Sequence, residues 1–376
     1  MSEALTWPLS VPVLSDGTVT LRAHTPADVP DMTFMCQQPE ASRYTTIPEH
    51  YTTQTAEDYI SRVIPDGWDS GTGRVWAIEA PHEDDGPSRF AGNISLGRGR
   101  APEIGFIAHP GARGRGIVTA AVRMVTNWAF TEGLAEAIGW KAVAGNTGSL
   151  RVAHACGFRL SAAVPDLLDH PTGLYDGWMG VLCFGDPPVP RTRWAEPAVL
   201  GGSGIALRPL RTDDVTRLVQ AHADPEIRHW FADLPRHPTS DTARRVVEDS
   251  IWFAARGEQV TWAVADDQDR LVGWVSIADL ARMQWTGGEV AYWTHPEARG
   301  HGVMRQAVRL VLDHALRPEA DGGLGLRRIS AAAAVGNAAS LRVIEGAGFS
   351  PTGRQSLVEP LGDGTWSDLL EFELLR

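Results

Sequence analysis

Hydrophobic and polar residues alternate over several short runs of this chain, and between these runs the apolar residues return every three or four positions. Alternation is typical of half-buried strands, and the longer spacing is typical of helices. Residues 103–108 therefore predict a strand, and the apolar positions from Val118 to Ala129 predict a helix. Between them, Pro110 ends the strand because proline donates no ladder hydrogen bond, and the run Arg113-Gly-Arg-Gly116 predicts a glycine-rich turn.

The same patterns predict the other elements of the first half. Thr25 followed by Pro26 is typical of a helix start, and Gly157 is the residue type that commonly follows a helix end. A polar turn near 84–86 joins two strand-like runs into a hairpin. The predicted strands lie at 19–22, 75–78, 90–96, 137–144, 158 onward and 178–184, and the predicted helices at 29–37, 55–63 and 146–155.

The strand, turn and helix occur twice. Residues 289–307 repeat 103–121 without a gap, in the frame Glu, four apolar or small residues, a sixth position, then His-Pro-x-Ala-Arg-Gly-x-Gly. Equivalent positions of the two halves differ by 186 in residue number (289 minus 103), and Arg22 and Arg208 show the same difference. Near the end of each half the difference is 191, as between Asn146 and Asn337 (337 minus 146). The indels fall in predicted loops, as in a duplicated domain. We therefore predict an α/β (α+β) fold with two tandem domains, 1–185 and 201–376, joined by a linker over 186–200.

Composition limits the possible functions. The 376 residues carry a formal net charge of −12, which argues against non-specific binding to nucleic acid or to anionic membranes. No apolar run approaches the roughly 20 residues that span a bilayer, and the N-terminus lacks the pattern of a signal peptide. The three cysteines, Cys36, Cys156 and Cys183, show neither paired nor metal-type spacing. We expect a cytoplasmic protein with buried, inert thiols, no metal, no nucleic acid and no membrane partner, present as a monomer or a homodimer.

The repeated turn has the chemistry of an anion site. A helix start presents unpaired N–H groups and the positive end of the helix dipole. Gly114 and Gly116 allow the backbone to approach a phosphate, and Arg113 and Arg115 add positive charge. A phosphate or pyrophosphate is therefore the expected ligand. For one copy alone an ordinary basic turn would explain the sequence equally well, but the second copy matches over 19 positions (121 minus 102).

The order of motifs in each half resembles the GNAT acyltransferase superfamily, closest to the branch with the ribosomal-protein N-terminal acetyltransferases. The family pattern Arg/Gln-x-x-Gly-x-Gly/Ala matches Arg113 to Val118 and Arg299 to Met304, and both copies depart from it at the last position. The resemblance implies a mixed sheet splayed between its fourth and fifth strands, with coenzyme A in the split. It implies cofactor contacts from Phe106, Ile107, Ala108, Arg113, Gly114, Arg115, Gly116, Ile117, Val118 and Asn146, and from Tyr292, Trp293, Thr294, Arg299, Gly300, His301, Gly302, Val303, Met304 and Asn337.

Acyl transfer to an amine requires a base, because the amine attacks a thioester only after it loses a proton. Glu103 and Glu289 lie on the strand beside the expected thioester and are the candidate catalytic bases; alternatively they pair with a cation or orient the substrate. Ser149 and Ser340 are candidate hydrogen-bond donors to the leaving sulfur; alternatively they cap their own helices. The tyrosine that many relatives place in the following helix is absent, which leaves the proton donor open.

Two further features have simpler interpretations. His109 and His295 recur before proline without metal-site spacing, so we interpret them as turn residues whose polar atoms are satisfied locally. No cysteine lies on the predicted strand, which favours direct transfer over an acyl-enzyme. Between the halves, Trp140 and Lys141 are replaced by alanines at 331 and 332.

Several alternatives stay open. The donor is acetyl-CoA or another acyl-CoA, or else a phosphopantetheine thioester on an acyl carrier protein. The acceptor is an amine-bearing metabolite or a peptide N-terminus, and by family analogy segments 38–60 and 223–250 line its cleft. We expect two coenzyme pockets; one domain could still be non-catalytic, and the whole protein could be a coenzyme A sensor. The second pocket is expected to be less basic near neutral pH, because His301 replaces Arg115.

Overall fold

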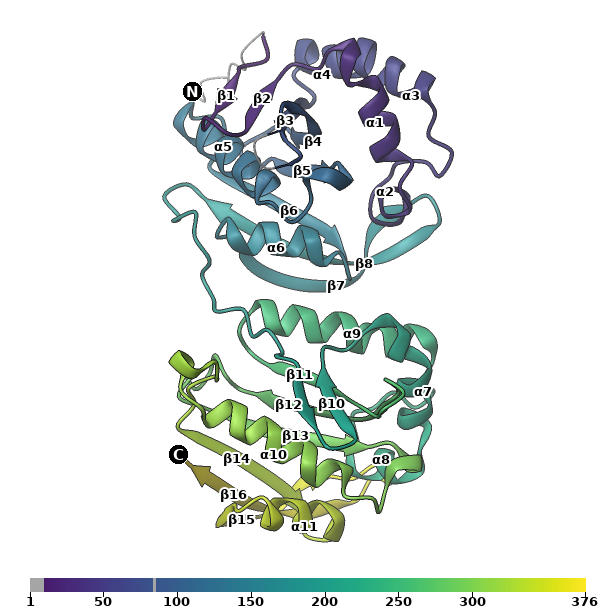
Figure 1. Cartoon of the computed structure of the whole chain (residues 1–376), viewed down its shortest axis with the longest axis vertical. Helices are drawn as coiled ribbons and strands as arrows, with labels where there is room; N and C mark the ends of the chain where they lie inside the picture. The colour runs from purple at the N-terminus through teal and green to yellow at the C-terminus, as the bar shows by residue number, and fades with distance from the viewer. Residues whose placement is uncertain (1–9, 84–85) are drawn as a thin grey trace. The chain divides into compact units, whose positions relative to one another are not determined.

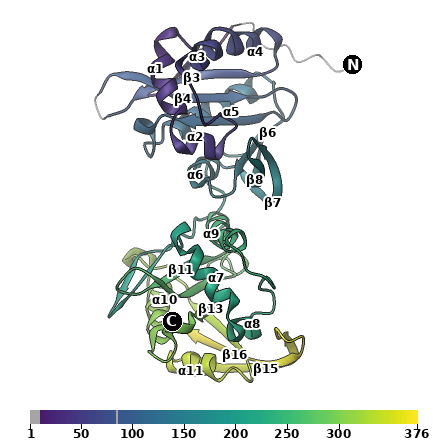
Figure 2. The same cartoon turned by 90° about the vertical axis from the view of Figure 1, so that its right-hand side faces the viewer.

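The computed structural model describes residues 10–83 and 86–376, and the chain divides into two compact units, Met1–Arg191 and Thr192–Arg376 (Figures 1 and 2). We call them the first and the second domain. The boundary between them lies inside the segment 186–200 that we expected to be a linker.

The first domain contains eight strands and six α-helices among its described residues. The strands are β1 (Leu14–Ser15), β2 (Thr20–Arg22), β3 (Arg74–Pro81), β4 (Ser88–Leu96), β5 (Glu103–Ala108), β6 (Ala137–Val143), β7 (Arg159–His170) and β8 (Gly173–Cys183). The helices are α1 (Val29–Cys36), α2 (Pro39–Tyr44), α3 (Thr53–Asp58), α4 (Ile64–Ser70), α5 (Ile117–Thr131) and α6 (Thr147–Ala155).

The second domain repeats this series. Its strands are β9 (Leu200–Gly202), β10 (Ile205–Arg208), β11 (Val260–Ala265), β12 (Leu271–Ala278), β13 (Gly287–Thr294), β14 (Arg328–Ala334), β15 (Ser350–Pro360) and β16 (Trp366–Leu375). Its helices are α7 (Val215–Ala223), α8 (Pro225–Trp230), α9 (Ser240–Ala255), α10 (Val303–Leu316) and α11 (Ala338–Gly346).

Both sheets have the same mixed topology, which confirms the predicted fold class. The strand order is β1-β2-β3-β4-β5-β6-β8-β7 in the first domain and the equivalent order from β9 to β15 in the second. Among the strands of the described residues, only β5 with β6 and β13 with β14 run parallel. The resemblance placed the split of the sheet between the fourth and fifth strands. In this chain it lies between the fifth and sixth, because the short edge strand β1 precedes the others.

Residues repeated outside the turn have structural roles. Arg22 forms a two-bond ion pair with the buried Asp28, both bonds 2.8 Å long, and Arg208 does the same with Asp214. The indole of Trp76 donates to Pro12 O at 3.0 Å, and the equivalent indole in the second domain bonds to a carbonyl in the same way. The matching positions at the start of each half therefore tie the first strands to the core rather than to a ligand.

The linker is shorter than we expected. Ala195 is 1% exposed in the core of the second domain, and Ala198 O accepts a hydrogen bond of 2.8 Å from Trp262 Nε1. The glycines at 201–202 form the edge strand β9 against β10. Residues 192–200 thus begin the second domain. Composition alone misassigned them, because their contacts with the second domain, such as that of Ala198 with Trp262, join residues far apart along the chain.

The helix predicted at 55–63 is longer and interrupted. A π-helical turn at Tyr59–Val63 separates α3 from α4, and the Ile64 N–H bonds to Tyr59 O, five residues back. Pro65 follows at the start of α4 and has no N–H to continue the ordinary ladder, which explains the local widening. Of the predicted hairpin turn at 84–86, Asp84 and Asp85 lie outside the described residues.

Candidate active sites

The glycine-rich turns adopt a backbone conformation that requires glycine. Gly114 and Gly116 have φ values of 73° and 76°, and Gly300 and Gly302 have 78° and 73°. A Cβ atom at any of these four positions would have no atom within 4 Å, so the backbone angle, and not crowding, selects glycine. The space above both turns is therefore open.

Each turn leads into a helix whose first N–H groups have no side-chain cap. Gly116 is the N-cap residue of α5 and Gly302 that of α10, and neither cap position provides a side-chain hydrogen bond. The last position of the family pattern, Val118 or Met304, is buried at 8% or 5% exposure. These larger side chains pack inside the domain and leave the N–H groups of the turn uncovered.

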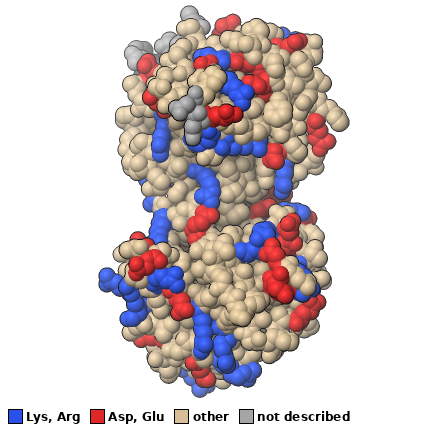
Figure 3. Space-filling model, viewed as in Figure 1, with Lys and Arg blue, Asp and Glu red and all other residues tan. Residues whose placement is uncertain are grey.

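The turn arginines are already held by carboxylates. Arg113 Nη1 lies 3.4 Å from Glu40 of α2, whereas Arg299 lies 2.5 Å from Asp224 and 2.9 Å from Glu226 at the start of α8. An anion at the second turn would therefore share its arginine with two acidic groups. Over the face seen in Figure 3, charged side chains of both signs are interspersed among broad uncharged areas.

The sheet opens beside each turn. β5 and β6 are paired only at Glu103 with Gly139 and at Ile104 with Trp140, and β13 and β14 only over 287–289 with 328–330. Within the described chain, the edge of 106–108 that faces β6 has no ladder partner, although its other edge is paired with β4. Unpaired backbone groups on an open strand edge can bind an extended ligand that carries amide groups, as pantetheine does.

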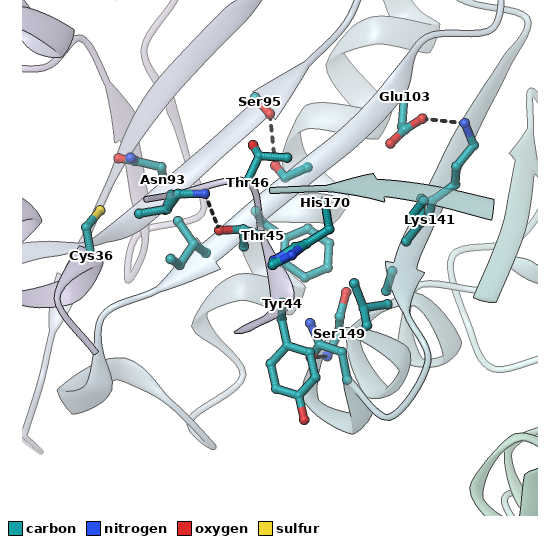
Figure 4. A pocket seen from close by; sticks show the side chains of 18 of the residues that line it. Cys36, Tyr44, Thr45, Thr46, Asn93, Ser95, Glu103, Lys141, Ser149 and His170 are labelled. Carbon is teal, nitrogen blue, oxygen red and sulfur yellow. Dashed lines mark hydrogen bonds and ion pairs between the residues drawn. The ribbon is translucent and has the colours of Figure 1, made fainter. Parts of the chain in front are cut away.

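A cavity lies at the split of each domain, with different extents. The first, of about 600 Å³, runs from Glu103 and Lys141 past Ser149 to the end of α2 (Figure 4). The second, of about 590 Å³, lies between the turn at 299–305 and Ser340 and reaches Trp230. The first cavity thus includes its candidate base, and the second includes its glycine-rich turn. Both are of the size of ordinary small-molecule sites.

In the first domain the candidate base is ion-paired. Lys141 Nζ lies 3.0 Å from Glu103 Oε2, and the two side chains are 37% and 53% exposed (Figure 4). Lys141 is the only lysine of the chain, which has arginine at its other 33 cationic positions (34 minus 1). This is the alternative that the sequence left open for Glu103. A half-exposed pair of this kind binds weakly and can be exchanged for another cation.

In the second domain the candidate base has no such partner. Position 332 is alanine, and within the described chain Glu289 forms no ion pair. Burial raises the pKa of Glu289 above its ordinary value, the charge of Asp279 adds to this effect, and Arg282 opposes it. A carboxylate with a raised pKa is a stronger proton acceptor near neutrality, which suits Glu289 to the role of base.

The serines do not cap their helices. Asn146 Oδ1 accepts the hydrogen bond from Ser149 N at 3.1 Å, and Asn337 Oδ1 accepts that from Ser340 N at 3.0 Å. The asparagine oxygens are therefore engaged in capping, which leaves only their NH₂ groups for a cofactor. Ser149 Oγ accepts from Trp140 Nε1 at 2.9 Å, and because an indole only donates, the hydroxyl proton of Ser149 is left to donate elsewhere.

Sequence reasoning missed a hydroxyl group in the second domain. Tyr292 OH lies 2.9 Å from Ser340 Oγ, although we expected only the backbone of Tyr292 to take part. Burial raises its pKa to about 12, so it stays protonated and can donate a hydrogen bond. The equivalent residue in the first domain is Phe106, without a hydroxyl. The alignment of the two halves shows this difference, but not that the ring reaches α11.

The histidines before proline, His109 and His295, line neither cavity. His109 Nδ1 accepts from Gly111 N at 3.1 Å and His295 Nδ1 from Glu297 N at 3.4 Å. The expectation that their polar atoms are satisfied locally is wrong for His295, because its buried Nε2 has no hydrogen-bond partner among the described residues. Burial lowers the pKa of both rings, which keeps them neutral. Burial also raises the pKa of Cys36 to about 11 and that of Cys156 to about 12. The described residues contain no cluster suited to a metal ion and no helix that could cross a membrane.

Comparison with known proteins is consistent with this geometry. The family model described as "Acetyltransferase (GNAT) domain" matches residues 18–159 and again residues 205–350. The chain is similar to the "Probable N-acetyltransferase YjcK" of Bacillus subtilis (strain 168), with 35% identity over 176 residues, 45% of this chain and 93% of that protein.

Two similar solved structures each cover about half of this chain, which is the length of one domain. The ribosomal-protein-S5-alanine acetyltransferase from Vibrio fischeri is 20% identical, with a TM-score of 0.42, over 47% of this chain and 96% of that one. RimJ from Mycobacterium smegmatis, in complex with CoA-disulfide, is 20% identical, with a TM-score of 0.42, over 49% of this chain and 88% of that one.

Proposed function

This chain belongs to the acetyltransferase (GNAT) domain family and is an N-acetyltransferase with two consecutive copies of the domain. We propose that it transfers an acetyl group from acetyl-CoA directly to a primary amine. The observation that carries the proposal is the open edge of β5 and of β13. At one end of it lies an uncapped helix start with left-handed glycines, and at the other end a glutamate carboxylate.

The residues of the split suit each requirement of the reaction. The N–H groups at the start of α5 and α10 would hold the pyrophosphate, and the unpaired edge over 106–108 or 292–294 would bind the pantetheine. Glu103 or Glu289 would take a proton from the ammonium group of the acceptor, directly or through water. The amine nitrogen then attacks the thioester carbonyl and the C–N bond forms. The nitrogen loses its second proton as the C–S bond breaks, and the departing thiolate takes up one proton to leave as the thiol.

The leaving thiolate needs a proton or a hydrogen bond. In the first domain Ser149 would supply it, because the indole of Trp140 leaves the serine proton free. In the second domain the pair of Tyr292 and Ser340 would supply it. An acceptor that is a small amine or a peptide N-terminus would fit this chemistry equally.

Two other functions compete with this one. If an acyl carrier protein were the donor, the nucleotide-binding turn would be used less. Val118 and Met304 are buried and leave that turn open, which favours a free nucleotide thioester as the donor. A protein with a single catalytic domain is favoured by one observation, the ion pair of Glu103 with Lys141, which the second domain lacks. In that case the second domain would catalyse and the first would bind coenzyme A only.

Calorimetry with acetyl-CoA tests the proposal. The wild type should bind two equivalents, Gly116→Glu and Gly302→Glu should each lose one, and the double variant should lose both. Binding by the double variant equal to that of the wild type would refute the pocket assignment. A thiol-release assay with a panel of amines then measures turnover, and Glu103→Gln and Glu289→Gln assign it to one domain or both.

A further inference from the structure

We infer that the first domain contains an acceptor compartment for a primary amine joined to an uncharged, apolar body of about the size of one ring, and that the second domain lacks this compartment. The inference rests on the proposed function and names the acceptor of one of its two sites. It excludes a protein N-terminus as the preferred acceptor of the first domain.

The inner walls of the compartment are uncharged. The charged residues that line the first cavity are Glu103, Lys141 and Asp169, and all three are exposed at its mouth. Behind them the cavity continues over the sheet to α1 and α3, where uncharged side chains form its walls: aromatic and aliphatic ones together with the polar Thr55, Asn93 and Ser95. These inner lining residues include Cys36, Ile47, Tyr51, Tyr59, Val75 and Ile107. Such a surface binds an apolar body by burial and offers no partner to a second charge.

Two contacts close the sides of the mouth. Tyr44 OH reaches from the end of α2 to Gly145 O at 3.4 Å, and His170 Nε2 at the end of β7 lies 2.7 Å from Ser42 O. Figure 4 shows the side chains of Tyr44 and His170 among those that line the cavity. The elements on either side of the split are thus joined around the entrance. A small amine can enter such a compartment whole, whereas a peptide chain would need an open groove for its following residues.

The second domain fills the equivalent space with larger side chains. Asn93 pairs with Ala77 on one side and Ile107 on the other, and in the same register Trp274 pairs with Ala263 and Trp293. Asn93 and Ile107 line the first cavity. In the second domain Trp274 packs against an apolar core, and Trp293 belongs to that core and presents its remaining surface to the second cavity.

At a third pair of equivalent positions, the second domain again has the larger side chain. His222 replaces Cys36 on the first long helix of the domain (offset 186, from 36 to 222), and its ring lies 6.0 Å from that of Trp293 in an edge-to-face arrangement. Phe231 and Leu234 pack against the same core. The second cavity accordingly has Tyr292 and Ser340 in its lining but does not extend to Glu289. The acceptor end is therefore hollow in one domain and filled in the other.

The test transfers the second-domain residue into the first. Asn93→Trp should reduce kcat/KM for 2-phenylethylamine by about 10- to 100-fold, the loss expected when one ring can no longer be buried. Binding of acetyl-CoA by calorimetry should stay at two equivalents. Asn93→Leu is the matched control: it also loses the 2.8 Å contact with His24 but adds little volume, so activity with the same amine should be retained. Val75→Phe fills the compartment from another strand and serves if Asn93→Trp does not fold.

The outcomes separate the inference from the proposed function. Faster turnover of a tripeptide with a free N-terminus than of 2-phenylethylamine by Glu289→Gln, in which only the first domain retains its base, would overturn the inference. So would full activity of both Asn93→Trp and Val75→Phe with 2-phenylethylamine. A wild type that binds no acetyl-CoA would instead refute the proposed function itself.

Discussion

Replacement of Gly116 by alanine separates the strain of the turn from its role as an anion site. The backbone of Gly116 has φ of 76°, and an added Cβ would meet no atom within 4 Å. The cost is therefore conformational only, about 1–2 kcal/mol for a left-handed L-residue. In a domain of this size each kcal/mol lowers the unfolding temperature by about 2–4 °C.

The same substitution should weaken ligand binding more than it weakens the fold. The new methyl group would project into the open space above the first N–H groups of α5, where the pyrophosphate is proposed to lie. At a ligand concentration of about 100 times Kd, a bound ligand stabilises the native state by about 2.7 kcal/mol. We expect the wild-type first domain to gain this amount from acetyl-CoA in thermal unfolding, and Gly116→Ala to gain less than half of it.

Gly133 provides a matched control at the opposite end of the same helix. Its φ is 66°, and a Cβ there also meets no atom within 4 Å. Gly133→Ala should lose the same stability as Gly116→Ala and keep the full gain from acetyl-CoA. Equal gains in both variants would refute the anion site, and an unchanged unfolding temperature in Gly116→Ala would refute the argument from backbone strain.

Three further predictions concern the split. Glu289→Gln should lower turnover more at neutral than at high pH. The pKa of Glu289 is raised in the folded state, so ionisation of this carboxyl destabilises the fold as pH rises. Glu289→Gln should therefore be more stable than the wild type at pH 7 and lose that advantage in acid. Equal chemical denaturation curves of the two proteins at pH 7 would contradict this. Lys141→Met should change the free energy of unfolding by at most about 1 kcal/mol. In Glu289→Gln protein the same substitution should raise kcat/KM for amines, because the ammonium group of the acceptor no longer competes with Lys141 for Glu103. Unchanged kcat/KM would contradict this. Tyr292→Phe should reduce second-domain turnover, measured in Glu103→Gln protein, by about 10–100-fold with unchanged affinity for acetyl-CoA, and full activity would exclude the tyrosine as proton donor.

Local chemistry explains what could be predicted for the fold. The strand at 103–108, the glycine turn and the following helix were predicted nearly to the residue, because alternation, φ-permissive glycine and helical spacing are properties of neighbouring residues. Local composition failed at 192–200, which have the sequence of a linker but belong to the second domain. It also failed at Tyr59–Val63, where a proline downstream widens the helix.

Which side chains meet across the split could not be predicted in this way. Lys141 reaches Glu103 from a parallel strand, and Tyr292 reaches Ser340 from 48 positions away. Such distances depend on strand register and on the packing of whole elements, about which sequence periodicity carries no information.

The sequence by itself determined that this protein is a duplicated α/β domain with two glycine-rich helix starts. Repetition can be read by comparing the two halves, and local backbone preferences depend only on neighbouring residues. Only the tertiary structure decided that one glutamate is paired and the other is not, and that one acceptor end is hollow while tryptophans fill the other. The physical reason is that volume and charge at a site are sums over side chains from distant segments, and folding alone brings those segments together.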